Sequence, residues 1–305
     1  MSKLYSIGEL LIDFQSVGTG GLKDTKQFVK NAGGAPANVC VQAVKLGQKA
    51  VYLTKVGGDG FGDFLIEVLN GEGVDTSHIL RSDKYDTSLA FVSYKEDGER
   101  EFVFYRKAAA DLHFTAEEFK DVEFEKGDIL EFGSVALKTA EAKGAHLALI
   151  EKAKKAGATV CFDPNLRFNL WDSASELKDS VNEFLPYADV VKVGADELEF
   201  LTGGSIEAMF AGGLKILLVT DGGKGAKLYL ADGREFACNG YKVKAVDTTG
   251  AGDSFFGGFI AQLMEGKTSY QEMLEFACKC GAYTTTGYGA IPAMGNKEKI
   301  ERAVK

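Results

Sequence analysis

Strand-like and helix-like segments alternate in the second half of the chain, and this alternation constrains the fold more than any other feature. Residues 129–132, 158–162 and 189–193 are short apolar runs, and helical patterns at 139–155 and 173–185 separate them. A strand, a helix and another strand in this order form a right-handed crossover between parallel strands. The pattern therefore predicts an α/β fold with a mostly parallel central sheet flanked by helices.

The composition fits one such domain with a small appendage, or two domains. The chain has 305 residues, 45% of them hydrophobic, and a net charge of −9. This acidic balance argues against binding to nucleic acid or to a membrane surface. The sequence has no apolar run of membrane-spanning length. Glu9 and Asp13 interrupt the first apolar run, so we expect no signal peptide.

The cysteines and histidines do not have the spacing of a metal site. The five cysteines are an odd number without a CxxC pair, and the three histidines are far apart in the sequence. We therefore expect reduced thiols and a cytoplasmic location.

A second group of strand patterns lies in the first third of the chain. Two of them flank Asp97-Gly98, a dipeptide typical of a type I′ hairpin turn, and residues 27–30 form another. We expect a small separate sheet, built from about 14–33 and 87–107, that acts as a lid and excludes water from a site beneath it. The alternative is that the hairpin forms an edge of the main sheet.

The stretch Asp247–Asp253 is predicted to be a turn between a strand and a helix. Residues 241–246 alternate like a strand, and the apolar residues after Asp253 repeat at helical spacing. Two glycines allow close backbone approach, and the N–H groups of Ala251, Gly252 and Asp253 would point out from a helix N-terminus, which attracts anions. The Asp253 carboxylate could then take a proton from a nucleophile that attacks the anion. The alternative is an ordinary glycine turn with an acid at the helix start.

The nine residues of this turn and helix start, DTTGAGDSF, resemble the second signature of the ribokinase-like sugar kinases, also called the PfkB group. The resemblance implies a ribokinase-like fold and ATP-dependent phosphorylation of a sugar. It implies that Asp253 is the catalytic base. It also implies that the amides of Gly250, Ala251 and Gly252, with that of Asp253, bind the transferring phosphoryl group.

Further segments resemble the sugar-binding elements of this family, most closely those of bacterial fructokinases. They are GELLIDF at 8–14, the Gly-Gly-x-x-x-Asn pattern at 33–38, and FYRKAAAD at 104–111, whose Lys-Ala-Ala filling departs from the usual one. Taken alone, each would equally fit an ordinary loop. The resemblance implies D-fructose as the sugar and fructose 6-phosphate as the product. The candidate sugar contacts are Asp13, Gly33, Gly34, Asn38, Arg106 and, from DPNLRFNLW, Asn165.

Other segments resemble the phosphate-binding and nucleotide-binding elements of the family. Arg167 in DPNLRFNLW matches an arginine that neutralises phosphate, a role that suits the bidentate geometry of a guanidinium group. Residues 219–225 resemble VTxGxxG, and 289–292 resemble the GAIP loop beside adenine, although Cys278 stands where asparagine is frequent. The candidate nucleotide contacts are Thr220, Gly222, Gly225 and Lys192, for which a solvated lysine is an equal alternative.

The resemblance also implies bound cations. Glu197 matches a glutamate that holds Mg²⁺ through waters, but Gly194 replaces the family's asparagine, so the metal network departs from the pattern. Some members bind a monovalent cation, for which Asp247 and Thr249 are the matching ligands. The expected cofactors are therefore ATP and Mg²⁺, with K⁺ at these two residues.

Other functions stay open at this point. The same scaffold could phosphorylate 2-keto-3-deoxygluconate or ribose, or could bind a sugar or nucleotide as a regulator without turnover. An unrelated Rossmann-like binding protein would require all the motifs to be coincidental. The sequence has no G-x-G-x-x-G, HRD or DFG motif, which argues against a dinucleotide-binding dehydrogenase and a protein kinase. An exposed lid edge also predicts a homodimer formed through the lid.

Overall fold

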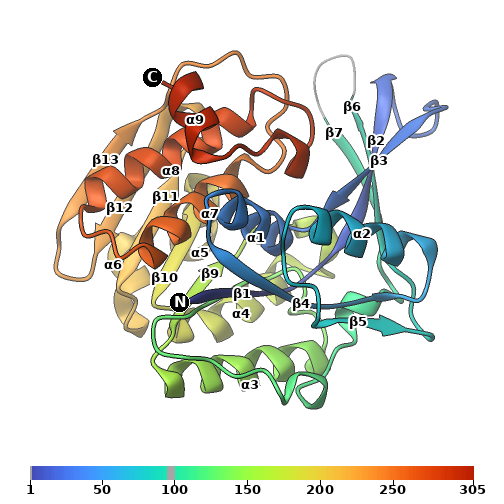
Figure 1. Cartoon of the computed structure of the whole chain (residues 1–305), viewed down its shortest axis with the longest axis horizontal. Helices are drawn as coiled ribbons and strands as arrows, with labels where there is room; N and C mark the ends of the chain where they lie inside the picture. Colours follow the sequence, from blue (N-terminus) through green and yellow to red (C-terminus); the bar gives the residue numbers. More distant parts are fainter. Residues whose placement is uncertain (1, 95–99) are drawn as a thin grey trace.

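The computed structural model describes residues 2–94 and 100–305, which form a large sheet, a small sheet and flanking helices (Figure 1). The strand order of the large sheet is β13-β12-β11-β10-β9-β8-β1-β4-β5. Neighbouring strands are parallel from β5 to β11, and β12 and β13 are antiparallel additions. The predicted mostly parallel sheet is therefore confirmed. Its strands are β1 (Lys3–Ile7), β4 (Lys49–Gly57), β5 (Ile79–Ser82), β8 (Ile129–Gly133), β9 (Thr159–Asp163), β10 (Val190–Gly194), β11 (Ile216–Thr220), β12 (Gly225–Leu230) and β13 (Glu235–Asn239).

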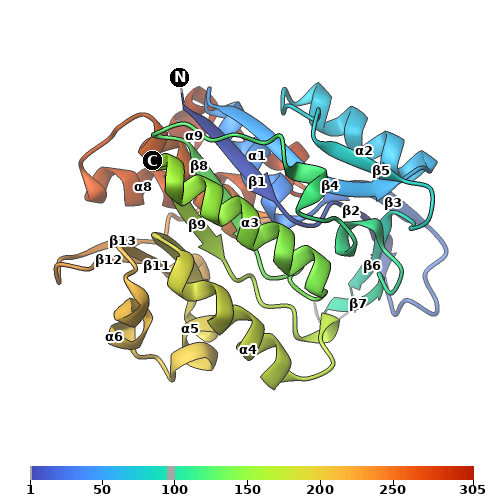
Figure 2. The ribbon, with the colours of Figure 1, turned by 90° about the horizontal axis from the view of Figure 1, so that it is seen from below.

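Helices cover both faces of this sheet, which is why its central strands are continuous apolar runs (Figure 2). On one face pack α1 (Ala35–Lys45), α2 (Gly60–Gly71), α7 (Ala251–Met264) and α8 (Tyr270–Thr284), with α9 (Lys297–Ala303) against α8. On the other pack α3 (Ala140–Ala156), α4 (Ala174–Phe184), α5 (Ala195–Thr202) and α6 (Ile206–Met209). Within the described residues, no helix has both the length and the apolar character needed to cross a membrane.

The ends of α3 show how the sequence sets the helix boundaries. The Thr139 hydroxyl accepts a hydrogen bond from the N–H of Ala142 at 3.2 Å, which caps the first turn. Gly157 ends the helix in the left-handed conformation, with φ 78°. The helix predicted at 139–155 is confirmed with both of these ends.

The small sheet is separate from the large one, with the order β3-β2-β6-β7. This confirms the predicted separate sheet, and the alternative of a hairpin at the edge of the main sheet is wrong. The action of the small sheet as a lid stays a prediction. Its back is covered by α2, where the rings of Phe14 and Phe61 meet edge to face. The predicted turn at Asp97-Gly98 lies outside the described residues. The strands are β2 (Leu11–Thr19), β3 (Phe28–Gly33), β6 (Ser88–Tyr94) and β7 (Arg100–Tyr105).

The strand predicted at 241–246 is wrong. The last strand of the large sheet ends at Asn239, and the segment after it has no strand assignment. Tyr241, Val243 and Ala245 instead line a cavity. The alternation in the sequence is real, but every second residue lines this cavity rather than pairing in a strand, and Tyr241 also packs against the core.

Candidate active site

A larger and a smaller cavity share a wall beyond the C-terminal ends of the parallel strands. The larger has a volume of about 610 Å³ and lies beneath the small sheet, and the smaller has about 390 Å³. Thr248 and Gly252 line both cavities. The segment that leads into α7 therefore separates them, at the place where open parallel sheets bind ligands.

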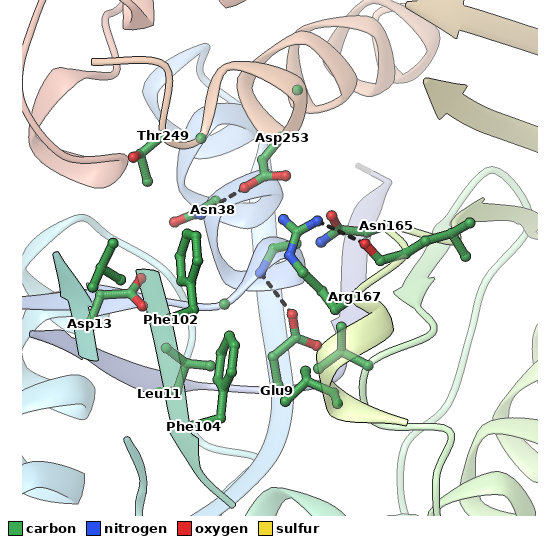
Figure 3. A pocket seen from close by; sticks show the side chains of 18 of the residues that line it. Glu9, Leu11, Asp13, Asn38, Phe102, Phe104, Asn165, Arg167, Thr249 and Asp253 are labelled. Atoms are coloured by element: carbon green, nitrogen blue, oxygen red, sulfur yellow. Dashed lines mark hydrogen bonds between the residues drawn. The ribbon is translucent and has the colours of Figure 1, made fainter. Parts of the chain in front are cut away.

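The larger cavity is apolar on one side and polar on the other (Figure 3). The small sheet supplies most of the apolar side together with Asp13 and Gln15, and α1, α7 and the loops after the main strands supply most of the other polar groups. This combination suits a ligand that carries both C–H faces and hydroxyl groups. The apolar side chains are Leu11, Val92, Phe102 and Phe104, and the polar ones include Glu9, Asp13, Asn38, Asn165, Arg167, Lys192 and Asp253.

Asp253 lies in the first turn of α7 and lines the larger cavity. The turn requires a glycine before it, because Gly250 has φ 75° and a Cβ there would lie 2.5 Å from the Cβ of Ala290. The side-chain amide of Asn38 donates a hydrogen bond to Asp253 Oδ2 at 2.7 Å (Figure 3). Burial raises the pKa of Asp253, and the Lys192 ammonium and the Asn38 hydrogen bond oppose this rise.

The amides at this helix start are not equivalent. The N–H of Ala251 donates to the carbonyl of Thr248 at 3.3 Å, so it takes part in the turn. Gly250 and Gly252 line the larger cavity, and Gly252 also lines the smaller one. The first turn of a helix attracts anions through its N–H groups and dipole. The anion-binding role stays a prediction, and the amides of Gly252 and Asp253 fit it better than that of Ala251.

Lys192 is buried, with 7% of its surface exposed, and its ammonium lies 2.9 Å from Asp163 Oδ2. This burial excludes the alternative of a solvated lysine. The ammonium also lies 3.1 Å from the position that a Cβ on Gly252 would take, so it sits directly below the helix start. Burial alone would lower the pKa of Lys192, but Asp163, Glu197 and Asp253 together raise it, so this side chain carries a positive charge.

Arg167 is exposed and lines the larger cavity, and its guanidinium donates to the carbonyl of Leu166 at 3.1 Å. Its charge opposes the rise in pKa of both Asp13 and Asp253. Asn165, two residues earlier, has φ 44° and is the one non-glycine residue with a positive φ in the described part of the chain. This uncommon conformation turns the chain at the end of β9, and such strain clusters at functional sites.

Asp13 lies on β2 and faces the cavity above a glycine pair. A Cβ on Gly33 would lie 2.1 Å from Asp13 Oδ2, so the carboxylate rests directly on the backbone. Gly34 has φ 119°, and a Cβ there would lie 2.3 Å from the carbonyl oxygen of Glu9. Burial raises the pKa of Asp13 to about 7. The predicted sugar contacts Asp13, Gly34, Asn38 and Asn165 all line the larger cavity, and Gly33 lies beneath Asp13.

Arg106 is not one of the described residues that line the larger cavity. Its guanidinium is buried in an ion pair with Asp111 at 3.0 Å and donates to the Ser88 hydroxyl at 3.0 Å. It also donates to the carbonyl of Val135, which does line the cavity, at 3.4 Å. Arg106 therefore lies behind the wall, and its contact with the sugar stays a prediction that requires the side chain to move.

The smaller cavity brings together the three predicted nucleotide contacts Thr220, Gly222 and Gly225. They come from the end of β11 and the start of β12, and the 241–245 segment and α8 form the opposite side. Cys278 also lines this cavity, at the position where the family often has asparagine. Lys192 lines the larger cavity instead, near the shared wall.

Glu197 uses both carboxylate oxygens within the protein. Oε1 accepts from the N–H of Leu166 and Oε2 from the N–H of Gly194, each at 2.7 Å. The side chain thus ties the loop after β9 to the start of α5. Each oxygen keeps a second lone pair, so the group can still accept a hydrogen bond from a water bound to an ion. Among the residues that the structure describes, no cluster of three or more His, Cys, Asp or Glu could hold a metal.

Asp247 is buried and organises the loop before α7. Its Oδ1 accepts from the N–H of Thr249 at 3.0 Å and from the Thr249 hydroxyl at 2.7 Å, and its Oδ2 accepts from the N–H of Gly289 at 3.0 Å. The carboxylate therefore joins the loop to the segment that follows α8. Whether these residues also bind a monovalent cation stays a prediction.

Two carboxylates at the site were not among the sequence candidates. Glu9 lines the larger cavity, and Asp163 holds Lys192. Both are acids at or just beyond the C-terminal end of an apolar strand, β1 for Glu9 and β9 for Asp163. An acid at the end of a strand was therefore the feature of the sequence that could have identified both residues as candidates.

Comparison with known proteins gives a consistent result over the whole chain. Residues 1–296 match the pfkB family carbohydrate kinase. Fructokinase-2 of Solanum lycopersicum is 41% identical over 306 residues, which span 95% of this chain and 92% of that protein.

Two solved structures share the fold over nearly their full length. Fructokinase from Vibrio cholerae O395 in its fructose, ADP and calcium ion bound form is 33% identical, with a TM-score of 0.90 and coverage of 100% of this chain and 99% of that one. A putative ribokinase II from E. coli in complex with ATP and Mg²⁺ is 29% identical, with a TM-score of 0.88 and coverage of 99% and 98%. The fold is therefore ribokinase-like.

Proposed function

The chain belongs to the pfkB family of carbohydrate kinases, and from this premise we propose that it transfers the γ-phosphoryl group of ATP to D-fructose, forming fructose 6-phosphate. The observation that carries the proposal is the likeness to fructokinases over the full chain. The two cavities that meet at Gly252 support it. A sugar in the larger cavity and ATP in the smaller one would bring the hydroxyl and the γ-phosphate to the same wall.

Asp253 is the proposed general base. Its carboxylate lines the sugar cavity beside that wall, where it would take the proton of the attacking hydroxyl. The Asn38 amide binds Oδ2 and so leaves Oδ1 as the oxygen for the proton. Because burial raises the pKa of Asp253, protonation should reduce activity on the acid side of neutrality.

The positive charges for the transferring phosphoryl group come from several elements. Lys192 lies below the helix start, Arg167 borders the sugar cavity, and the amides of Gly252 and Asp253 lie at the positive end of α7. Fixed donors of this kind stabilise charge that develops in the transition state. We propose that Asp163 keeps Lys192 in place, since its carboxylate fixes the ammonium.

We propose that Mg²⁺ accompanies ATP and neutralises charge on its phosphates. Two backbone N–H groups hold the Glu197 carboxylate in a fixed orientation. In this orientation the carboxylate would accept hydrogen bonds from the waters of this ion. K⁺ near Asp247 and Thr249 would fix the loop before α7. ADP formation with and without EDTA, and in K⁺ against Na⁺ buffers, tests both cations.

A coupled ADP-release assay over a sugar panel tests the proposed substrate. We expect the highest kcat/KM with D-fructose, and lower values with ribose and 2-keto-3-deoxygluconate. Ribose is the second candidate, because a ribokinase-like structure matches the chain almost as well as the fructokinase. Binding of fructose and ATP without any ADP release would instead identify a regulator.

We also propose a homodimer formed through the small sheet, in the cytoplasm. Large apolar side chains are exposed on this sheet, and burial against a second copy would remove them from water. Light scattering measures the oligomeric state. Cell fractionation measures the location, and the five buried free thiols support the cytoplasm. The exposed side chains are Val17 (56%), Val29 (53%), Phe102 (41%), Val103 (40%) and Tyr105 (64%).

A further inference from the structure

Glu9 is a buried carboxylate at the sugar cavity with only one of its two oxygens in use. Its side chain lines the cavity and the residue is 3% exposed. Oε1 accepts a hydrogen bond from the N–H of Ala35 at 3.0 Å, which caps α1 where the N-cap Gly34 has no side chain to do so (Figure 3). Oε2 is buried and has no hydrogen-bond partner within the described residues.

The backbone around Glu9 fixes this orientation. Its own carbonyl accepts a hydrogen bond from the Tyr52 hydroxyl at 2.5 Å, and Gly34 packs against the same carbonyl without room for a Cβ. The charges of Arg106 and Asp111 act on the carboxylate, and these two side chains pair with each other at 3.0 Å. Within the described residues, the pairing of Arg106 with Asp111 leaves Oε2 without a partner.

Asn38, in the first turn of the same helix, also has one polar side-chain atom that is hydrogen-bonded and one that is not. Its Nδ2 donates to Asp253, while Oδ1 is buried and has no partner among the described residues. Both orphaned oxygens belong to side chains that line one cavity. A buried acceptor without a partner costs about 1–3 kcal/mol, so two of them beside one cavity indicate a ligand that supplies hydrogen-bond donors.

We propose that Glu9 is a sugar-binding residue, whose Oε2 accepts a hydrogen bond from one hydroxyl of the substrate while Oε1 remains on the helix cap. This inference rests on the proposed function and adds a contact that fixes the sugar at the end of the cavity away from the phosphoryl group. Glu9 takes no part in the chemical step. It selects for a sugar that carries a hydroxyl at this position, because the analogue without it would leave the buried oxygen unpaired.

The test measures binding of D-fructose and of its single-deoxy analogues by titration calorimetry, with wild type and Glu9→Gln. The glutamine keeps the oxygen that caps α1 and replaces Oε2 by an amide NH₂, which cannot accept a hydrogen bond. In wild type we expect one analogue to bind about 10-fold to 100-fold more weakly than fructose. In Glu9→Gln that ratio should fall below about 3-fold.

Glu131→Gln is the matched control. Glu131 is also buried, and its Oε2 is also without a partner among the described residues, but it does not line the cavity. Its analogue ratios should equal those of wild type. If Glu9→Gln does not fold, Glu9→Asp, which withdraws the carboxylate by one methylene, should reduce the same ratio.

Two results would overturn the assignment in different ways. A wild type that phosphorylates fructose, with analogue ratios unchanged in Glu9→Gln, removes the contact and leaves the proposed function intact. A wild type that binds no sugar of the panel removes the proposed function and the contact together.

Discussion

Replacing Asn38 by leucine tests how the proposed base is held. The amide of Asn38 donates to Asp253 Oδ2 at 2.7 Å and joins α1 to α7 across 215 residues of sequence. Leucine has a similar size and no donor. Without the bond, Oδ2 loses its fixed position, and the pKa of Asp253 rises further because one of the groups that oppose its rise is gone.

The size of the expected loss in kcat follows from the one hydrogen bond that the substitution removes. A hydrogen bond to a charged group contributes about 1.5–3 kcal/mol, which corresponds to about 10-fold to 150-fold in kcat if the transition state loses all of it. A pH profile from 5 to 9 with the coupled ADP assay should show this loss. The acid limb of kcat/KM should also move to higher pH. Charged groups that share in this titration include Lys192 on β10, Arg167 after β9 and Glu197 on α5. The carboxyl groups of Asp13, Glu131 and Asp163 also interact with Asp253.

The pH profile separates orientation of the base from sugar contact. If Asn38 only binds the sugar, its loss raises KM and leaves the acid limb where it was; that result would refute the reasoning. Asn169→Leu is the control, because Asn169 lines the same cavity and has no hydrogen bond to Asp253. Its acid limb should coincide with that of wild type.

Three further predictions concern charge burial and the helix start. Burial lowers the pKa of His146 to about 4. Between pH about 6.5 and 4 the unfolded chain therefore binds a proton that the native state does not. The free energy of unfolding decreases as the pH is lowered through this range, by up to about 3 kcal/mol. Urea unfolding at several pH values should show this loss in wild type and not in His146→Gln. Glu9 and Asp13, whose pKa values are raised, act in the opposite direction, so the difference between the two proteins is the quantity to read. Lys192→Met leaves Asp163 buried and unpaired, and should lower the free energy of unfolding by about 3–5 kcal/mol at pH 8; a loss below 1 kcal/mol would contradict the ion pair. Gly250→Ala should reduce kcat at least 10-fold, because its Cβ would clash with Ala290 in a conformation with φ 75°; near wild-type kcat would show that the turn tolerates a side chain.

The sequence predicted the layers of the fold because each main strand and helix carries its own local signal. The 139–155 helix has a capping threonine before it and a glycine that ends it, so both boundaries are encoded locally. The 241–246 segment failed because periodicity reports which side chains are buried and not what they face. Here they face the smaller cavity.

The candidate site was predictable as a set of loops but not as a set of contacts. Asp13, Asn38, Arg167 and Asp253 are far apart in sequence and line one cavity. The pairing of Arg106 with Asp111 and of Lys192 with Asp163 depends on packing across strands, which no local pattern encodes. The position of Glu9 just beyond a strand was a signal, but its free oxygen is visible only once α1 is in place.

The central claim is that Asp253 removes the proton from the sugar hydroxyl, and the turnover of Asp253→Asn tests it most directly. The amide keeps the size of the side chain and cannot act as a base. With saturating fructose and ATP we predict a kcat about 10²-fold to 10⁴-fold below wild type, with the KM for fructose changed little and the melting temperature preserved. A folded Asp253→Asn protein that turns over at close to the wild-type rate would contradict the account.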